Sequence, residues 1–256
     1  MKDYEFIDVI KAQDGVAVVS LNRPKALNAL NKAMILELDR AFDEMVNDSL
    51  VRVVVITGEK NFAAGADISN MLTLSPEQAK EFSFRHTFNK IENFPKPVIA
   101  VLSGFVLGGG LELALSCDMR IASPDIKLGF PEINLGIFPG AGGTQRLPRL
   151  IGSARAKELI FLGNAINVTK AAKYGLVTLV TENPLAEALK LAGELAAKPP
   201  VALKLAKQCI NLAFDVEQRT GIEFEAVAWS STFATEDQRA GMKAFTEKRK
   251  VVFTGN

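Results

Sequence analysis

Two short and almost wholly apolar runs do most to limit the folds open to this chain. VRVVVITG (51–58) and VIAVLSG (98–104) are rich in β-branched residues, so each is predicted to be a buried strand. Ahead of the first run, NKAMILELDRAFDEMVND (31–48) repeats apolar residues at helical spacing and predicts an amphipathic helix. Strands and helices therefore alternate over the first hundred residues, which indicates an α/β fold.

Turn and cap signals predict two further elements. YEFIDVIKA (4–12) and GVAVVSLNR (15–23) flank the turn Gln13-Asp14-Gly15 and predict a β-hairpin. The stretch Ser75-Pro76-Glu77-Gln78 has serine at the cap, proline in the first turn and glutamine three residues on. That pattern is typical of the start of a helix.

The pattern becomes mostly helical after Arg146. LVTLV (176–180) predicts a short strand, and Thr235-Glu236-Asp237-Gln238 predicts the cap of the last helix. The ranges expected to be mostly helical are 153–163, 168–174, 184–197, 199–214 and 216–250. We expect an α/β core followed by a helical C-terminal part that docks on the core or on a neighbouring subunit.

Composition excludes several classes of function. The chain has 256 residues, of which 48% are hydrophobic, and a formal net charge of +1. This balance gives no general attraction to nucleic acid or to an anionic membrane surface. The two distant cysteines, the lack of a signal-like N-terminus and the lack of an apolar run of about 18 residues lead us to expect a soluble, cytoplasmic protein.

The single histidine, His86, argues against two kinds of catalysis. One histidine and two distant cysteines do not provide a zinc-type ligand cluster, so no metal site is expected. A Ser-His-Asp triad would have to use His86, and no G-x-S-x-G motif accompanies it. We interpret His86 as an ordinary helix residue.

The glycine-rich runs do not match the common phosphate-binding motifs. The run 108–110 has Leu113 at the third glycine position of a dinucleotide fingerprint, and the run 140–143 has Gln145 there. A P-loop beginning at Gly104 would lack its lysine. Either these glycines only make tight turns, or the loops at 108–110 and 62–67 each bring one backbone N–H to a ligand oxygen, as in an oxyanion hole.

Two glutamates stand among apolar residues. Glu112 lies in FVLGGGLELALS (105–116), and Glu132 lies in LGFPEINLGIFPG (128–140). Each is either a solvated edge or a carboxyl whose pKa is shifted for general acid/base work. Asp118 and Arg120, in contrast, are expected to be structural ion-pair partners.

Taken together, these motifs resemble the enoyl-CoA hydratase (crotonase) family, and its short-chain bacterial members in particular, over nearly the whole chain. The pieces that carry the resemblance are NRPKALNAL (22–30), FAAGADI (62–68), KPVIAVLSGFVLGGGLELALSCDMRIAS (96–123), FPEINLGIFPGAGGTQRLPRLIG (130–152) and STFATEDQRAGMKAFTEKRK (231–250). The resemblance implies a spiral of ββα turns in a core of residues 1–195, and a helical trimerisation part at 196–256. It also implies a homohexamer built as a dimer of trimers, and an acyl-CoA substrate with no separate cofactor.

The resemblance also assigns roles to residues. It implies that the N–H groups of Ala66 and Gly109 form the oxyanion hole, that Glu112 and Glu132 are catalytic, and that Gly140 helps to place the water. The residues implied to bind CoA are Ala26, Leu27, Ala64, Asp67 and Ile68, together with Phe245 and Lys248 reaching in from a neighbouring subunit.

Two positions depart from the family pattern. Phe130 stands before the Pro-Glu pair, where a polar residue such as glutamine is frequent, and this removes a possible hydrogen-bond partner of the glutamates. Leu111 stands where cysteine is frequent, a change expected to affect packing only.

Three functions are compatible with these residues. Hydration of a 2-enoyl-CoA is favoured, because both glutamates are kept. Double-bond isomerisation, or another reaction through the same enolate, is the alternative, since many isomerases need only one of the two carboxylates. The remote alternative is a non-catalytic or RNA-binding protein, for which the run Glu247-Lys248-Arg249-Lys250 is the nearest basic candidate.

Overall fold

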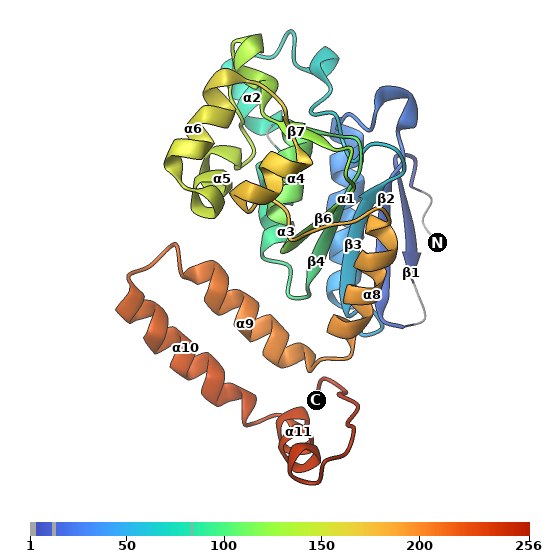
Figure 1. Ribbon diagram of the computed structural model, residues 1–256, viewed down its shortest axis with the longest axis vertical. Helices are drawn as coiled ribbons and strands as arrows, with labels where there is room; N and C mark the ends of the chain where they lie inside the picture. Colours follow the sequence, from blue (N-terminus) through green and yellow to red (C-terminus); the bar gives the residue numbers. More distant parts are fainter. Residues whose placement is uncertain (1–3, 12–13, 83) are drawn as a thin grey trace.

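The computed structural model describes residues 4–11, 14–82 and 84–256 and contains two sheets (Figure 1). The main sheet has the order β1-β2-β3-β4-β6-β9. Its strands are β1 (Ile7–Lys11), β2 (Val16–Leu21), β3 (Val53–Gly58), β4 (Val98–Leu102), β6 (Met119–Ala122) and β9 (Leu179–Val180). A smaller sheet has the order β5-β7-β8, with β5 (Phe105–Leu107), β7 (Lys127–Gly129) and β8 (Ile166–Asn167).

The main sheet is parallel except at its first pair. β1 and β2 pair antiparallel, with Val9 opposite Val19, so the predicted hairpin is confirmed. Gln13 of the predicted turn lies outside the described residues. β3 and β4 are the predicted buried strands, and their neighbours in the sheet run parallel to them.

Both faces of the central strands are covered by helices, which explains why these strands are apolar throughout. Val54 and Ile56 of β3 point into one core with α1 (Lys32–Val46), the predicted amphipathic helix. Val53 and Val55 point into a second core with α8 (Pro184–Ala196) on the opposite face (Figure 1). A strand that is buried on both faces does not show the alternation of apolar and polar residues that is typical of a surface strand.

The remaining helices connect these layers and extend the C-terminus. Those on the core are α2 (Pro76–Phe82), α3 (Arg85–Glu92), α4 (Gly109–Ser116), α5 (Gly143–Ile151), α6 (Ser153–Leu162) and α7 (Val168–Tyr174). The last three are α9 (Pro200–Leu212), α10 (Gln218–Thr232) and α11 (Glu236–Thr246). Short 3-10 helices lie at Pro24–Ala26 (η1), Ile68–Asn70 (η2) and Pro131–Leu135 (η3).

Both predicted helix caps are confirmed. The Ser75 Oγ accepts from the Gln78 N–H at 3.3 Å, and the Gln78 Oε1 accepts from the Ser75 N–H at 2.9 Å. The Thr235 Oγ1 accepts from the Gln238 N–H at 3.1 Å, at the start of α11. The predicted helical range 216–250 is divided between α10 and α11. The sequence did not predict α5, β6 or the smaller sheet.

The last three helices project from the core, with α9 and α10 lying side by side (Figure 1). α9 is tied to the core by Lys207, whose Nζ lies 2.8 Å from the Asp118 Oδ2. The same carboxylate oxygen accepts from the Val98 N–H at 2.7 Å, at the start of β4. Asp118 is therefore structural, but its ion-pair partner is Lys207. Arg120, the expected partner, instead donates to the carbonyl oxygens of Leu176 and Cys117, at 2.8 Å each.

The length and hydropathy of the helices bear on whether any of them could be a membrane span. None of those in the described ranges is long and apolar enough to cross a membrane.

The Lys207–Asp118 pair yields a stability prediction. Burial raises the pKa of the Asp118 carboxyl, and the Lys207 ammonium opposes that shift. Lys207→Met leaves the buried carboxylate without its counter-charge and should lower the free energy of unfolding by about 2–3 kcal/mol. Chemical denaturation at fixed protein concentration measures this. Lys204→Met, at an exposed position of α9, is the matched control, and equal midpoints for the two variants would contradict the assignment.

Candidate active site

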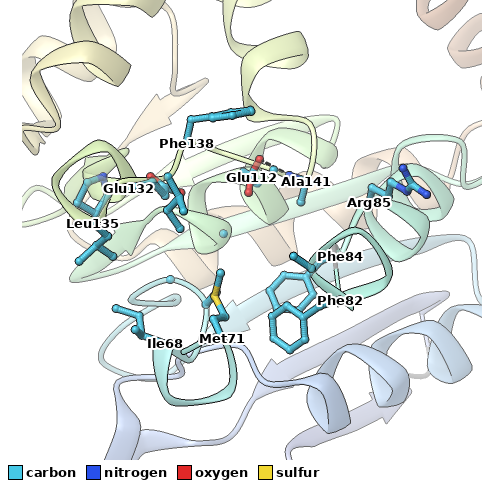
Figure 2. Close-up of a pocket in the computed structure, with 18 of the residues that line it drawn as sticks. Ile68, Met71, Phe82, Phe84, Arg85, Glu112, Glu132, Leu135, Phe138 and Ala141 are labelled. Carbon is cyan, nitrogen blue, oxygen red and sulfur yellow. Dashed lines mark hydrogen bonds between the residues drawn. The ribbon is translucent and has the colours of Figure 1, made fainter. Parts of the chain in front are cut away.

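A mostly apolar cavity of about 480 Å³ lies between the loop after β3, helices α2 and α3, the start of α4 and the segment 131–141. Figure 2 shows Glu112 and Glu132 on one side of this cavity, with Ile68, Met71 and Phe84 facing them from the other. Two carboxyl groups thus share one apolar space.

The first wall of the cavity is built at the junction of β5 and α4. Gly108 joins the two elements with φ +50° and ψ −124°, a conformation that L side chains rarely adopt. A Cβ on Gly108 would lie 2.8 Å from the Glu132 Oε1, and a Cβ on Gly110 would overlap the Ala63 carbonyl oxygen. Glycine is needed here because the backbone passes so close to its neighbours.

The amides of Ala66 and Gly109 meet at this wall. Leu30 donates to the Gly65 carbonyl at 2.8 Å and accepts from the Asp67 N–H at 2.8 Å. These bonds use the residues on either side of Ala66, so its own N–H points away from Leu30. Gly109 is the first residue of α4, where an N–H has no intrahelical acceptor. A Cβ added to Gly109 would lie only 3.5 Å from the Ala66 nitrogen, so the two amides are neighbours on the cavity wall.

Glu112 is held by two backbone donors. Its side chain lines the cavity, although the residue is only 3% exposed. The Oε1 accepts from the N–H groups of Ala141 and Gly143, at 2.7 Å each. Burial raises the pKa of the Glu112 carboxyl, while these two donors and the charge of Arg146 oppose the shift. The alternative of a solvated helix edge is therefore wrong for Glu112.

Glu132 occupies a different environment on η3. Its Oε2 is buried and has no hydrogen-bond partner among the described residues. Burial, with a smaller contribution from the negative charge of Glu112, raises the pKa of the Glu132 carboxyl to about 7. The two carboxyls therefore differ: two N–H groups favour the ionised form of Glu112 against the effect of burial, and Glu132 is poised to carry a proton near neutral pH.

The positions that depart from the family pattern lie behind the cavity. Phe130 is fully buried and does not line it, and its ring packs close to Gly143. A Cβ on Gly143 would meet both the Phe130 ring and the Glu112 Oε1 at 3.0 Å. Leu111 is buried in the core, in agreement with a packing role.

The residues expected to bind CoA divide into three groups. Ala64 and Ile68 line the cavity, as does Gly140, the residue expected to place the water. Ala26, Leu27 and Asp67 do not line it. Leu27 adjoins it through its carbonyl, which accepts from the Ala64 N–H at 3.1 Å, and Asp67 pairs with Arg23 at 2.7 Å. Phe245 and Lys248 lie at the far end of the chain, at and just beyond the end of α11, away from the cavity.

Sequence reasoning missed most of the apolar wall and the donors to Glu112. The missed residues lining the cavity include Met71, Phe82, Phe84, Leu135 and Phe138. The only local signal was the cluster of phenylalanines in EFSFRHTF (81–88), which contains Phe82 and Phe84. His86 is exposed on α3 and does not line the cavity. Across the described residues, no group of three or more histidine, cysteine, aspartate or glutamate side chains could hold a metal ion.

Comparison with known proteins identifies the family. The model of the enoyl-CoA hydratase/isomerase family matches residues 11–256. The chain belongs to this family. Its Glu112 and Glu132 therefore lie in an enoyl-CoA hydratase/isomerase fold, and the resemblance in the motifs extends over almost the entire sequence.

Relatives and solved structures agree with this membership. The chain is 46% identical to the short-chain-enoyl-CoA hydratase of Clostridium acetobutylicum, covering 96% of this chain and 97% of that protein. It is 45% identical to the crotonyl-CoA hydratase of Syntrophomonas wolfei, covering 98% of each. The structure matches that of the enoyl-CoA hydratase of Bacillus anthracis with a TM-score of 0.94 and 40% identity, covering 98% of this chain and 100% of that one. The expected α/β fold, a crotonase-type spiral with a helical C-terminal part, is confirmed.

The unequal carboxyl environments of this family member can be measured directly. With ¹³C-labelled glutamate side chains, one carboxyl resonance should titrate near pH 7, protonated below and ionised above, and it should be absent from Glu132→Gln. The physical reason is burial, which outweighs the hydrogen bond from the residue's own backbone. If every carboxyl of the wild-type protein titrates at ordinary glutamate values, the assigned environment of Glu132 is wrong.

Proposed function

We propose that this protein is an enoyl-CoA hydratase, which reversibly adds water across the double bond of a 2-enoyl-CoA to give a 3-hydroxyacyl-CoA. The observation that carries the proposal is the pair of glutamates with different environments beside two neighbouring backbone N–H groups. The names of the two bacterial relatives support the same reaction. Isomerisation is less favoured, because both carboxyl groups face the cavity.

The proposed oxyanion hole consists of the Ala66 and Gly109 N–H groups. In the proposed complex both donate to the thioester oxygen of the substrate. When water attacks the β carbon, the electron pair of the double bond moves toward this oxygen and forms an enolate. Preorganised donors at the position where charge develops stabilise such a state more than they stabilise the substrate.

The two glutamates divide the proton transfers. Glu112, stabilised as an anion by Ala141 and Gly143, takes a proton from the attacking water, which Gly140 helps to place. Glu132, whose pKa is raised to about 7, donates a proton to the α carbon as the enolate collapses. One C–O and one C–H bond form, while one carbon–carbon π bond and one O–H bond of the water break. Before the next turnover Glu112 releases the proton it took from the water and Glu132 takes one up, so no net proton is gained or lost. Dehydration follows the same steps in reverse.

The CoA moiety is assigned to the edge of the cavity near Ala64 and Ile68, and it continues past Leu27 and Ala26 toward Asp67. Ala64 and Ile68 line the cavity, and Leu27 adjoins its edge, where the Leu27 carbonyl accepts from the Ala64 N–H. Coenzyme A is part of the substrate in this proposal, and no separate cofactor takes part.

The oligomeric state is also a proposal. α10 packs against α9 but still exposes Ile222, Val227 and Trp229, the last with 65% of its surface accessible, and together they form a large exposed apolar surface. We assign residues 1–195 to a core carrying the site and 196–256 to assembly into a homohexamer, a dimer of trimers. In it, Phe245 and Lys248 reach the CoA of a neighbouring subunit.

Light scattering coupled to size exclusion should give the mass of a hexamer for the wild-type protein. Trp229→Glu should shift the mass toward smaller species, because it places a charge in an apolar contact. Glu223→Gln on the same helix is the control. A wild-type protein that elutes as a monomer would exclude the proposed assembly.

The reaction is tested by following loss of the conjugated enoyl thioester in the ultraviolet, first with crotonyl-CoA and then with longer chains. We expect turnover without added metal or cofactor. A 3-enoyl-CoA substrate distinguishes hydration from isomerisation, because an isomerase would convert it to the conjugated 2-enoyl thioester and the absorbance would increase. If no chain length is hydrated, the proposed function is wrong.

The roles of the glutamates are tested in the same assay. Glu112→Gln and Glu132→Gln should each lower kcat by about 10²–10⁴-fold, because each removes one proton transfer while keeping the size of the side chain. Glu182→Gln, at an exposed position outside the cavity, should behave as the wild type. Near-normal turnover by either of the first two variants would contradict the two-carboxylate mechanism.

A further inference from the structure

Arg146 on α5 lies behind the active-site cavity and is held in one orientation. Its Nε donates to the Glu92 Oε1 at 3.0 Å and its Nη2 to the Glu92 Oε2 at 2.7 Å, which makes a two-pronged ion pair. The Nη2 also donates to the Asn89 Oδ1 at 2.6 Å. The Arg146 side chain is only 9% exposed. A planar guanidinium with several fixed acceptors is a rigid anchor.

The remaining nitrogen of this guanidinium reaches the loop that holds Glu112. The Arg146 Nη1 donates to the Ala141 carbonyl oxygen at 3.0 Å. Gly142, the next residue, has a φ of +112°, and a Cβ there would overlap the Arg146 Nη1. The loop therefore passes directly against the guanidinium, and only glycine permits this approach.

The bond to the Ala141 carbonyl fixes the peptide between two donors. The Ala141 N–H lies on the peptide before it, and the Gly143 N–H lies on the peptide after it. Both of these N–H groups donate to the Glu112 Oε1 at 2.7 Å. Since peptide units are planar, a rotation of the middle peptide would turn at least one donor away from Glu112.

We propose that Arg146 is a positioning residue of the hydration reaction: by anchoring the 141–143 loop against Glu92 and Asn89, it holds Glu112 in place for proton transfer. Arg146 does not line the cavity, so it acts through Glu112 and not on the substrate. The inference rests on the proposed function, in which Glu112 is the base. It assigns the positioning of Glu112 to Arg146, 34 positions away in the sequence.

The charged groups around Glu112 come from four elements. Glu132 on η3, Lys80 on α2 and Arg85 on α3 line the same cavity, and Arg146 approaches from α5 behind it. The positive charge of Arg146 lowers the pKa of the Glu112 carboxyl, against the effect of burial. Losing that charge should therefore raise this pKa and move the acidic limb of activity to higher pH, because the base must be ionised to accept a proton.

Arg146→Met tests the proposal by removing both the anchor and the charge. We expect kcat for crotonyl-CoA hydration to fall by about 100-fold, as for other misplaced catalytic groups. The acidic limb of the kcat profile should move to higher pH. KM should change little, since Arg146 does not touch the substrate. Arg149→Met, an exposed arginine one turn along α5, is the matched control and should keep the wild-type kcat and pH profile.

Two further variants separate the anchor from the charge. Arg146→Lys keeps the charge but loses the planar fork, so kcat should fall while the acidic limb stays near its wild-type position. Glu92→Gln keeps Arg146 but removes the carboxylate that holds it, and kcat should again fall. If the methionine variant does not fold, these two variants decide the question by the same measurements.

A titration without substrate separates this inference from the proposed function. In protein with ¹³C-labelled glutamate, the Glu112 carboxyl resonance is assigned by its absence from Glu112→Gln. Its titration midpoint should be higher in Arg146→Met than in Arg149→Met, whether or not the protein hydrates crotonyl-CoA. Equal midpoints, or equal kcat values for these two arginine variants, would overturn the role of Arg146. A failure of the wild-type hydration assay would instead overturn the proposed function.

Discussion

The close approach of backbone segments around Gly108–Gly110 is the constraint on which the rest of the site depends. Gly110 lets α4 start against the Ala63 carbonyl, and Gly108 leaves room for the Glu132 carboxyl. The same approach places the first amide of α4 beside the amide of Ala66. Any side chain at these two glycines would separate the layers, so the wall that carries these two amides and the position of Glu132 have one physical origin.

The fold of the central layers was accessible from the sequence, because local pattern and tertiary burial agree there. β3 and β4 are apolar on both faces because α1 and α8 cover them. This burial on both faces explains why their β-branched runs are unbroken. α5 was missed because its nine residues begin with glycine and include Pro148, both poor helix signals. β5, β7 and β8 have two or three residues each, too few to show a period.

The site was only partly predictable, for a different reason. Glu112 and Glu132 could be proposed because a carboxyl among apolar residues is unusual wherever it lies. The groups that set their protonation could not, since the donors to Glu112 come from Ala141 and Gly143, about thirty positions away. Nothing in the local sequence indicates which backbone N–H groups a buried carboxylate will meet. The presence of a carboxyl group among apolar residues can be seen in the local sequence, whereas its pKa depends on the tertiary fold.

The unpartnered oxygen of Glu132 shows how stability and function are divided in this fold. A buried polar atom without a hydrogen bond costs about 1–3 kcal/mol, and among the described residues the Glu132 Oε2 is in that position. The ordered interior on both faces of the sheet supplies the stability that offsets this cost. Glu112 meets the opposite requirement, because its donors are built into a loop fixed by α5. The donors to Glu112 favour its ionised form against the effect of burial, whereas burial favours the protonated form of Glu132, and one rigid scaffold maintains both environments within a single cavity.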